Sequence, residues 1–159
     1  MPPTEGETVP DFEALLCDGE TFQSTQLSDA LGARGGVLVA TGFAFSAIAR
    51  NWWKRFEKYG WGEFEDVPVL GFGRDGPYAQ NAFLRRLDEP PFEIFADVNG
   101  GIMDALDLRT DRSHMANTAT PWRSVFVVTP DREVQFAYVA EEWIGPLPHD
   151  DVEAAVAEL

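Results

Sequence analysis

The strongest constraint on the fold is a pair of largely apolar runs, at residues 36–43, where Val37, Leu38 and Val39 are consecutive, and at residues 67–72. Neither run alternates apolar with polar residues, which is the pattern of strands buried on both faces of a partly parallel sheet. Between the runs, apolar residues recur at spacings of 4, 3, 4 and 3 and predict an amphipathic helix that Gly60 ends: Phe45, Ala49, Trp52, Phe56 and Tyr59. Because parallel strands joined through a helix need covering on both faces, the chain is predicted to be α/β.

The N-terminal part of the chain predicts a β-hairpin. An apolar run at residues 12–17 precedes an Asp-Gly turn, and a second short β-rich segment follows the turn. Ser24 or Thr25 is then expected to cap a short helix that continues to residue 31.

The segments after the second apolar run complete one domain. In order, they predict a helix at 76–87, a strand at 92–96 after the Pro90-Pro91 pair, a short helix at 101–108, a polar loop at 109–121, an antiparallel hairpin of 124–128 and 134–139, and a closing helix from Asp150 or Asp151. This order fits a thioredoxin-like three-layer sandwich with a mixed central sheet, helices on both faces and the N-terminal hairpin as an extension. A length of 159 residues fits one such domain, spanning residues 1–159.

Charge and hydropathy limit the partners and the location of the chain. The formal net charge is -15, and this field would repel nucleic-acid phosphates and anionic membrane surfaces. No basic segment precedes a long apolar run at the N-terminus, and no stretch approaches the roughly 18 apolar residues of a membrane span. We therefore expect a cytoplasmic protein that binds neither nucleic acid nor membrane.

The excess of acidic over basic residues also indicates a cytoplasm of high salt concentration. Acidic residues number 27 against 12 basic residues, and the only lysines are Lys54 and Lys58, as in proteins of salt-accumulating halophiles. At about 1 M salt the Debye length falls to about 3 Å, so the repulsion between carboxylates is screened. The resulting hypothesis is a high-salt cytoplasm, and a melting temperature that does not change with salt would exclude it.

The one cysteine, Cys17, restricts redox chemistry. A single cysteine excludes an internal disulfide and any CxxC motif. Cys17 lies between an apolar run and Asp18, which would raise its pKa, so a buried structural thiol is expected. The alternative is a redox sensor or an intermolecular disulfide.

No metal or cofactor site is predicted. His114 and His149 lie far apart in the sequence and are expected to face solvent. Gly71-Phe72-Gly73 lacks the third glycine and the lysine of a phosphate-binding loop. The acidic residues Glu63, Glu65 and Asp66 are expected to form a solvated surface.

Four segments resemble the alkyl hydroperoxide reductase and thiol-specific antioxidant family, the peroxiredoxins. They are GETVPDF at 6–12, GGVLVATGFAFSAIARNWWKRF at 35–56, LGFGRDGPYAQNAFLRRL at 70–87 and WRSVFVVTPDREVQFAYV at 122–139. The family's active-site pattern is proline, three residues, threonine, two residues, cysteine. On this sequence the pattern falls on Gly42, Ser46 and Ala49. The family's usual glutamate falls on Trp52, and its late arginine matches Arg123.

The resemblance implies a family member without its reactive group. Peroxide reduction needs a thiolate nucleophile, which Ala49 does not offer. Ser46 and Arg123 could still hold a small anion or peroxide-like ligand. The leading interpretation is therefore a binding or assembly module that has lost thiol peroxidase activity. The alternative is an active thiol peroxidase, through Cys17 or through a cysteine that Ala49 has replaced by engineering.

Aromatic residues cluster around this pattern. They are expected mainly to pack in the core, although a pocket for an apolar ligand or a self-association surface is the alternative: Phe43, Phe45, Trp52, Trp53, Phe56 and Trp61. In the family the active-site loops lie near a dimer contact, so the resemblance also implies a homodimer.

Overall fold

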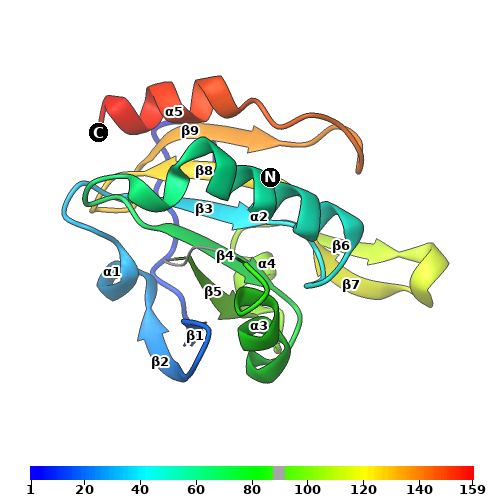
Figure 1. The fold of residues 1–159 in the computed structure, drawn as a ribbon. Helices are drawn as coiled ribbons and strands as arrows, with labels where there is room; N and C mark the ends of the chain where they lie inside the picture. Colours follow the sequence, from blue (N-terminus) through cyan, green and yellow to red (C-terminus); the bar gives the residue numbers. More distant parts are fainter. Residues whose placement is uncertain (88–91) are drawn as a thin grey trace.

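The computed structural model describes residues 1–87 and 92–159 and is built on a seven-stranded mixed sheet in the order β2-β1-β5-β4-β3-β8-β9 (Figure 1). The strands are β1 (Glu13–Cys17), β2 (Phe22–Gln26), β3 (Gly36–Ala40), β4 (Val69–Gly73), β5 (Glu93–Ala96), β8 (Ser124–Val128) and β9 (Val134–Val139), with β6 (Arg109–Arg112) and β7 (Thr118–Pro121) forming a separate two-stranded sheet. The helices are α1 (Leu27–Ala30), α2 (Ala47–Tyr59), α3 (Pro77–Leu84), α4 (Gly101–Ala105) and α5 (His149–Ala157). The predicted Pro90-Pro91 interruption lies outside the described residues.

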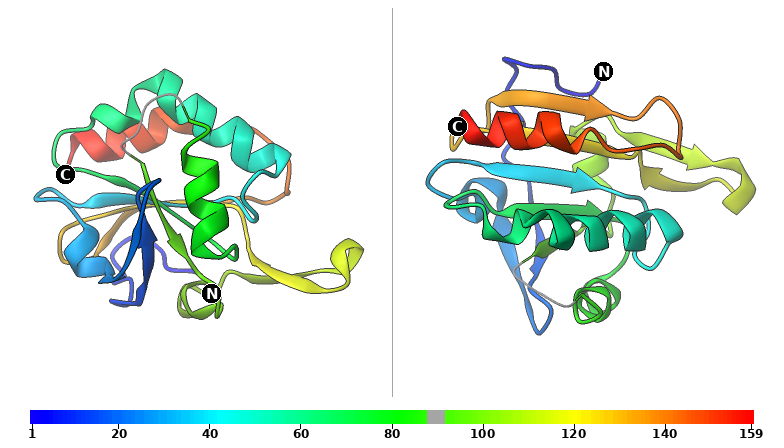
Figure 2. Two further views of the ribbon diagram at one scale, coloured as in Figure 1. Left: turned by 60° about the horizontal axis from the view of Figure 1, so that its bottom comes forward. Right: turned by 45° about the horizontal axis from the view of Figure 1, so that its top comes forward.

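Helices cover both faces of the sheet, as predicted. Alternate residues of β3 enter two separate cores: Val37 and Val39 pack in one, and Leu38 and Ala40 in the other. The first core includes buried residues of α2 and α5, and the second those of α1 and α4. Figure 2 shows α2, α3 and α5 on one side of the sheet and α1 and α4 on the other. This division makes the sheet the middle of three layers.

The two apolar runs form the parallel pair β3 and β4, in the register Val37 opposite Val69. Both strands are buried along their whole length. The amphipathic helix between them is α2, whose side chains of Ala49, Trp52, Trp53 and Phe56 are buried. Gly60 ends it in the left-handed conformation, with φ of 78°. These three elements therefore form as the sequence predicted, although β3 ends at Ala40 and leaves residues 41–46 as a loop.

The predicted cap of the first short helix is wrong. Ser24 and Thr25 belong to β2, where they pair with Leu15 and Ala14 of β1. Helix α1 begins at Leu27, and Asp11 accepts hydrogen bonds from the backbone and side chain of Ser28 at 2.8 and 2.7 Å. Ser24 and Thr25 therefore pair with β1 as part of a strand, although their local propensity favours the N-cap of a helix.

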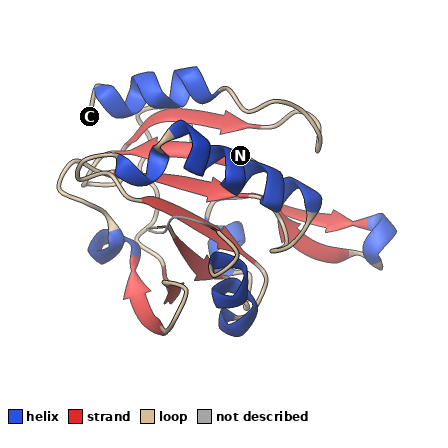
Figure 3. Cartoon of the chain, viewed as in Figure 1, coloured by secondary structure: helices blue, strands red, loops and turns tan. Residues whose placement is uncertain are grey.

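The segment at 109–121 is a hairpin of β6 and β7, where the sequence predicted a loop (Figure 3). Helix α4 correspondingly ends at Ala105 and α3 at Leu84, both earlier than predicted, whereas β8 and β9 have the predicted bounds. Figures 1 and 2 show the β6–β7 hairpin projecting from the end of the sheet. Within the described residues, none of the helices has the length and apolar character that crossing a membrane requires.

Candidate functional site

The loop between β3 and α2 carries the first position of the family pattern. Gly42 has φ of 86°, and a Cβ atom there would lie 2.8 Å from Cη2 of Trp143. The backbone N–H of Ala44 donates to Oδ2 of Asp75 at 2.7 Å, and burial raises the pKa of that carboxyl group. The side chain of Asp75 and the ring of Trp143 therefore hold this loop in a conformation that favours glycine.

Ser46 and Ala49 lie at the start of α2. Ser46 is the N-cap residue, and its Oγ accepts a hydrogen bond from the backbone N–H of Ala49 at 3.2 Å. Ala49 is 1% exposed, and its methyl group borders a cavity of about 10 Å³ that Trp53 and Phe83 also line. Position 49 is thus at the positive end of a 13-residue helix, but its side chain carries no reactive atom.

Arg123 is buried against Trp52, which lies one turn of α2 after Ala49. Its guanidinium carbon lies 5.0 Å from the ring centroid of Trp52, which occupies the family's glutamate position. Its Nη1 donates to the carbonyl of Gly145 at 2.7 Å, and its Nη2 donates to the carbonyl of Glu142 at 2.8 Å. Burial lowers the pKa of Arg123, which is 1% exposed. The arginine therefore fastens residues 142–145 over Trp52, while its buried Nε has no hydrogen-bond partner in the described part of the chain.

Residues 6–137 match the sequence profile of the AhpC/TSA family, which is most of the chain. The chain belongs to the AhpC/TSA family. AhpC of Mycobacterium tuberculosis superposes with a TM-score of 0.78 at 17% identity, over 99% of this chain and 99% of that chain. The reduced 2-Cys peroxiredoxin of Plasmodium vivax gives 0.79 at 17% identity, over 98% and 96%.

A third AhpC/TSA-like structure, Prx1a of Plasmodium yoelii modified at its N-terminus and described as an artifactual octamer, gives a TM-score of 0.75 at 18% identity, over 95% of this chain and 88% of that chain. No curated protein sequence matches the chain significantly. The structural likeness confirms the predicted thioredoxin-like fold for this AhpC/TSA protein.

The one thiol of this AhpC/TSA chain lies away from the start of α2. Cys17 ends β1, and in the sheet order β5 and β4 separate β1 from β3, the strand that leads to α2. Its side chain is completely buried. Burial, with a smaller contribution from Asp18, raises the pKa of Cys17 to about 11.

Alkylation of Cys17 is expected to be slow in the folded protein. A rise in pKa from 9.0 to about 11 is two pH units, so at pH 8 the thiolate fraction falls about a hundredfold. Iodoacetamide labelling followed by intact mass should therefore run at least about a hundredfold slower than in the urea-unfolded chain, and accelerate as the pH approaches 11. Equal rates for the folded and unfolded chains would contradict the burial of this thiol.

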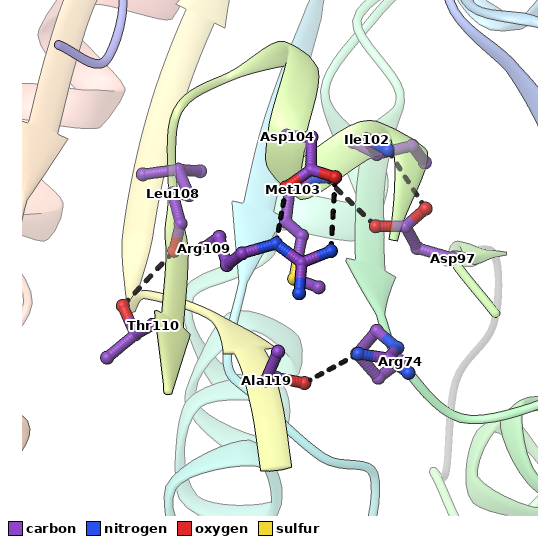
Figure 4. Close-up of polar contacts among 9 residues, drawn as sticks. All are labelled: Arg74, Asp97, Ile102, Met103, Asp104, Leu108, Arg109, Thr110 and Ala119. Atoms are coloured by element: carbon purple, nitrogen blue, oxygen red, sulfur yellow. Dashed lines mark hydrogen bonds and ion pairs between the residues drawn. The ribbon is translucent and has the colours of Figure 1, made fainter. Parts of the chain in front are cut away.

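The β6–β7 hairpin stands beside the loop that holds Gly42, and long-range polar contacts fix its base (Figure 4). Nη1 of Arg74, just after β4, donates to the carbonyl of Ala119 at 2.9 Å. Arg109 donates through Nε to Oδ1 of Asp104 at 2.6 Å and so joins β6 to α4. The buried carboxylate of Asp97 accepts the backbone N–H groups at the start of α4. These contacts give the hairpin a defined position that sequence reasoning missed.

The two histidines have different surroundings. His114 is exposed in the turn of the hairpin, as predicted. The ring of His149 stacks on Tyr59 at 4.2 Å, and its ligand atoms lie within 4.8 Å of those of Asp150 and Glu153. The sequence did not predict this grouping. Asp150 is 92% exposed, and Glu63, Glu65 and Asp66 of the predicted acidic surface are also exposed.

The aromatic residues near the pattern divide between core and surface. Trp52, Trp53, Phe56 and Trp61 are at most 2% exposed, and Phe56 stacks on Trp61 at 4.3 Å. These four confirm the predicted core packing. Phe45 is 40% exposed, with φ of 65°, so it belongs to the surface of the loop.

Proposed function

We propose that this AhpC/TSA-family protein has no thiol peroxidase activity and acts as a binding or assembly module. The observation that carries the proposal is the buried methyl group of Ala49 at the start of α2. A thiolate must attack the O–O bond of a peroxide, and a methyl group has no lone pair with which to do so. The fold and the helix start are retained, while the nucleophile is absent from that position.

Cys17 does not supply the missing chemistry in this proposal. It is completely buried, and its raised pKa keeps it as a thiol at neutral pH. No cation partner of its sulfur is present among the described residues, where its one hydrogen bond is a weak donation to the carbonyl of Leu15 at 3.9 Å. Engineering does not account for position 49 either, because Gly42, Ser46 and Trp52 also depart from the family pattern.

Peroxide consumption by the chain and by its Ala49→Cys variant tests the proposal. The natural chain is expected to consume hydrogen peroxide no faster than its Cys17→Ser variant. The introduced thiol would lie at the positive end of α2 beside Ser46, where the thiolate is favoured. We expect it to react with peroxide at least about tenfold faster than Cys17 at pH 7, measured as dimedone-trapped sulfenic acid by intact mass.

Ala49→Ser is the matched control, because it adds a polar atom of similar size without a thiol. It is expected to stay as inactive as the natural chain. Peroxide turnover by the natural chain that disappears in Cys17→Ser would instead establish the rival function, an active thiol peroxidase.

The assembly part of the proposal is a homodimer in a cytoplasm of high salt. Its support is the side chains of Phe45 and Ile144, which are 40% and 76% exposed near the start of α2. Sedimentation that shows only monomer in dilute and in concentrated salt would contradict it.

A further inference from the structure

A pocket of about 330 Å³ lies between the loop at residues 42–46 and the β6–β7 hairpin. The hairpin and the segment after β9 contribute Arg112, His114, Met115, Thr120 and Trp143 to its wall. Its loop side carries the aromatic residues Phe43 and Phe45 and the hydroxyl group of Ser46. The pocket therefore combines an apolar wall with a small set of polar groups, as ligand sites do.

Arg112 brings a cation with unused donors to this pocket. Its guanidinium carbon lies 4.0 Å from the ring centroid of Trp143 and 5.8 Å from that of Trp122. The side chain makes no hydrogen bond or ion pair with any residue in 1–87 or 92–159. Stacking uses the face of the guanidinium and leaves its edge, which carries the N–H groups, available to an acceptor.

Thr120 is the second, independent sign of a ligand. It is 1% exposed and lines the same pocket, and its Oγ1 has no hydrogen-bond partner in the described part of the chain. A buried hydroxyl group without a partner is costly, so such groups are rare in folded proteins. An acceptor or donor that enters the pocket would satisfy this oxygen.

The start of α2 adds to the preference for an anion. Oγ of Ser46 accepts the N–H of Ala49, which leaves the hydroxyl hydrogen free to be donated. The first turn of this 13-residue helix contains no acidic side chain that would compete for its positive end. The chain has a net charge of -15, yet this pocket is lined by the cation of Arg112 and by the hydroxyl groups of Ser46 and Thr120.

We propose that this pocket binds a small monocarboxylate with an apolar body, such as an aryl-substituted acetate. The carboxylate would lie against the edge of Arg112 and the hydroxyl groups of Ser46 and Thr120, and the apolar body against Phe43, Phe45 and Met115. One arginine matches the single charge of a carboxylate. The inference rests on the proposed function and deepens it, because it names the ligand of a binding module and assigns the cation role to Arg112 in place of Arg123.

Binding of phenylacetate tests the inference. It is measured by titration calorimetry and by the fluorescence of the tryptophans beside Arg112. Phenylacetamide, the neutral analogue, is expected to bind at least about tenfold more weakly, and inorganic phosphate not to compete. Arg112→Met should weaken phenylacetate binding at least about tenfold, with partial recovery in Arg112→Lys. Arg50→Met, which removes an exposed cation of α2 outside this pocket, should leave binding unchanged.

Thr120→Val separates a ligand role from a structural role. Because Oγ1 has no partner in the protein, the variant should be at least as stable as the natural chain when ligand-free, yet bind phenylacetate about fivefold more weakly. Lower stability of the ligand-free variant would show that the hydroxyl already has a solvent partner, and would overturn the argument.

Three binding results would also overturn the inference: no phenylacetate binding at millimolar concentration, binding unchanged by Arg112→Met, and phenylacetamide or phosphate binding as tightly as phenylacetate. These failures are distinct from failure of the proposed function, which is measured by peroxide consumption with no carboxylate present.

Discussion

Gly42→Pro, which installs the first residue of the family's active-site pattern, is expected to lower the free energy of unfolding by about 3 kcal/mol or more. Proline fixes φ near −65°, whereas Gly42 has φ of 86°, so the loop must rebuild to accept it. The ring would also meet Trp143, whose Cη2 lies 2.8 Å from the position of a Cβ atom. Urea unfolding followed by circular dichroism measures the loss.

Gly42→Ala is the matched control for this variant. Alanine tolerates the left-handed region at a cost of about 1 kcal/mol and adds one methyl group against Trp143. Its loss should therefore be smaller than that of the proline variant, although still measurable. If the proline variant were as stable as the natural chain, the loop would adopt the family's backbone, and departure from the pattern would be a matter of side chains alone.

The unit of β3, α2 and β4 could be predicted because its signals are local. Two apolar runs and a helical spacing between them are readable without knowledge of the rest of the chain. Gly60 as the end of the helix was predicted from the same local signals, whereas the helix start was not, because Phe45 of the apolar spacing lies in the loop before the N-cap Ser46. The resemblance then placed the family pattern on this unit.

The β6–β7 hairpin could not be predicted because its strands lack a local signal. Both are four residues long and polar or small, and β6 is exposed or only partly buried. What holds them is distant in sequence, namely the bond from Arg74 to Ala119 and the bond from Arg109 to Asp104. For the same reason no sequence signal joined Arg112 and Thr120 to the loop that contains Ser46, which they meet only across the pocket.

Arg123 was predicted as a site residue, but its hydrogen bonds could not be foreseen. The sequence shows an arginine at the expected family position, and the structure gives its two terminal nitrogens to carbonyls about twenty residues later in the chain. A pattern match fixes the position of a side chain, while the partners of that side chain depend on how a later loop folds back.

Arg123→Met is expected to lower the free energy of unfolding by about 2–4 kcal/mol and to release residues 142–145. The change removes two charge-assisted hydrogen bonds, to the carbonyls of Gly145 and Glu142, and the contact with the ring of Trp52. Relief of the burial cost of the cation offsets part of the loss, which is why the expected value stays below the sum of the bonds. Urea unfolding gives the energy, and hydrogen exchange of this segment gives its release.

Arg123→Lys tests whether the two hydrogen bonds of the guanidinium stabilise residues 142–145, or whether a positive charge at this position is sufficient. Lysine keeps the cation, but it lacks the planar fork that spans two carbonyls, so it should recover less than half of the lost stability. Unchanged protection of residues 142–145 in Arg123→Met would mean that the segment holds its place without the guanidinium, and would contradict the proposed role of Arg123 in fixing it. Faster exchange in both variants would instead mean that the planar guanidinium of Arg123, and not its charge alone, holds this loop in place.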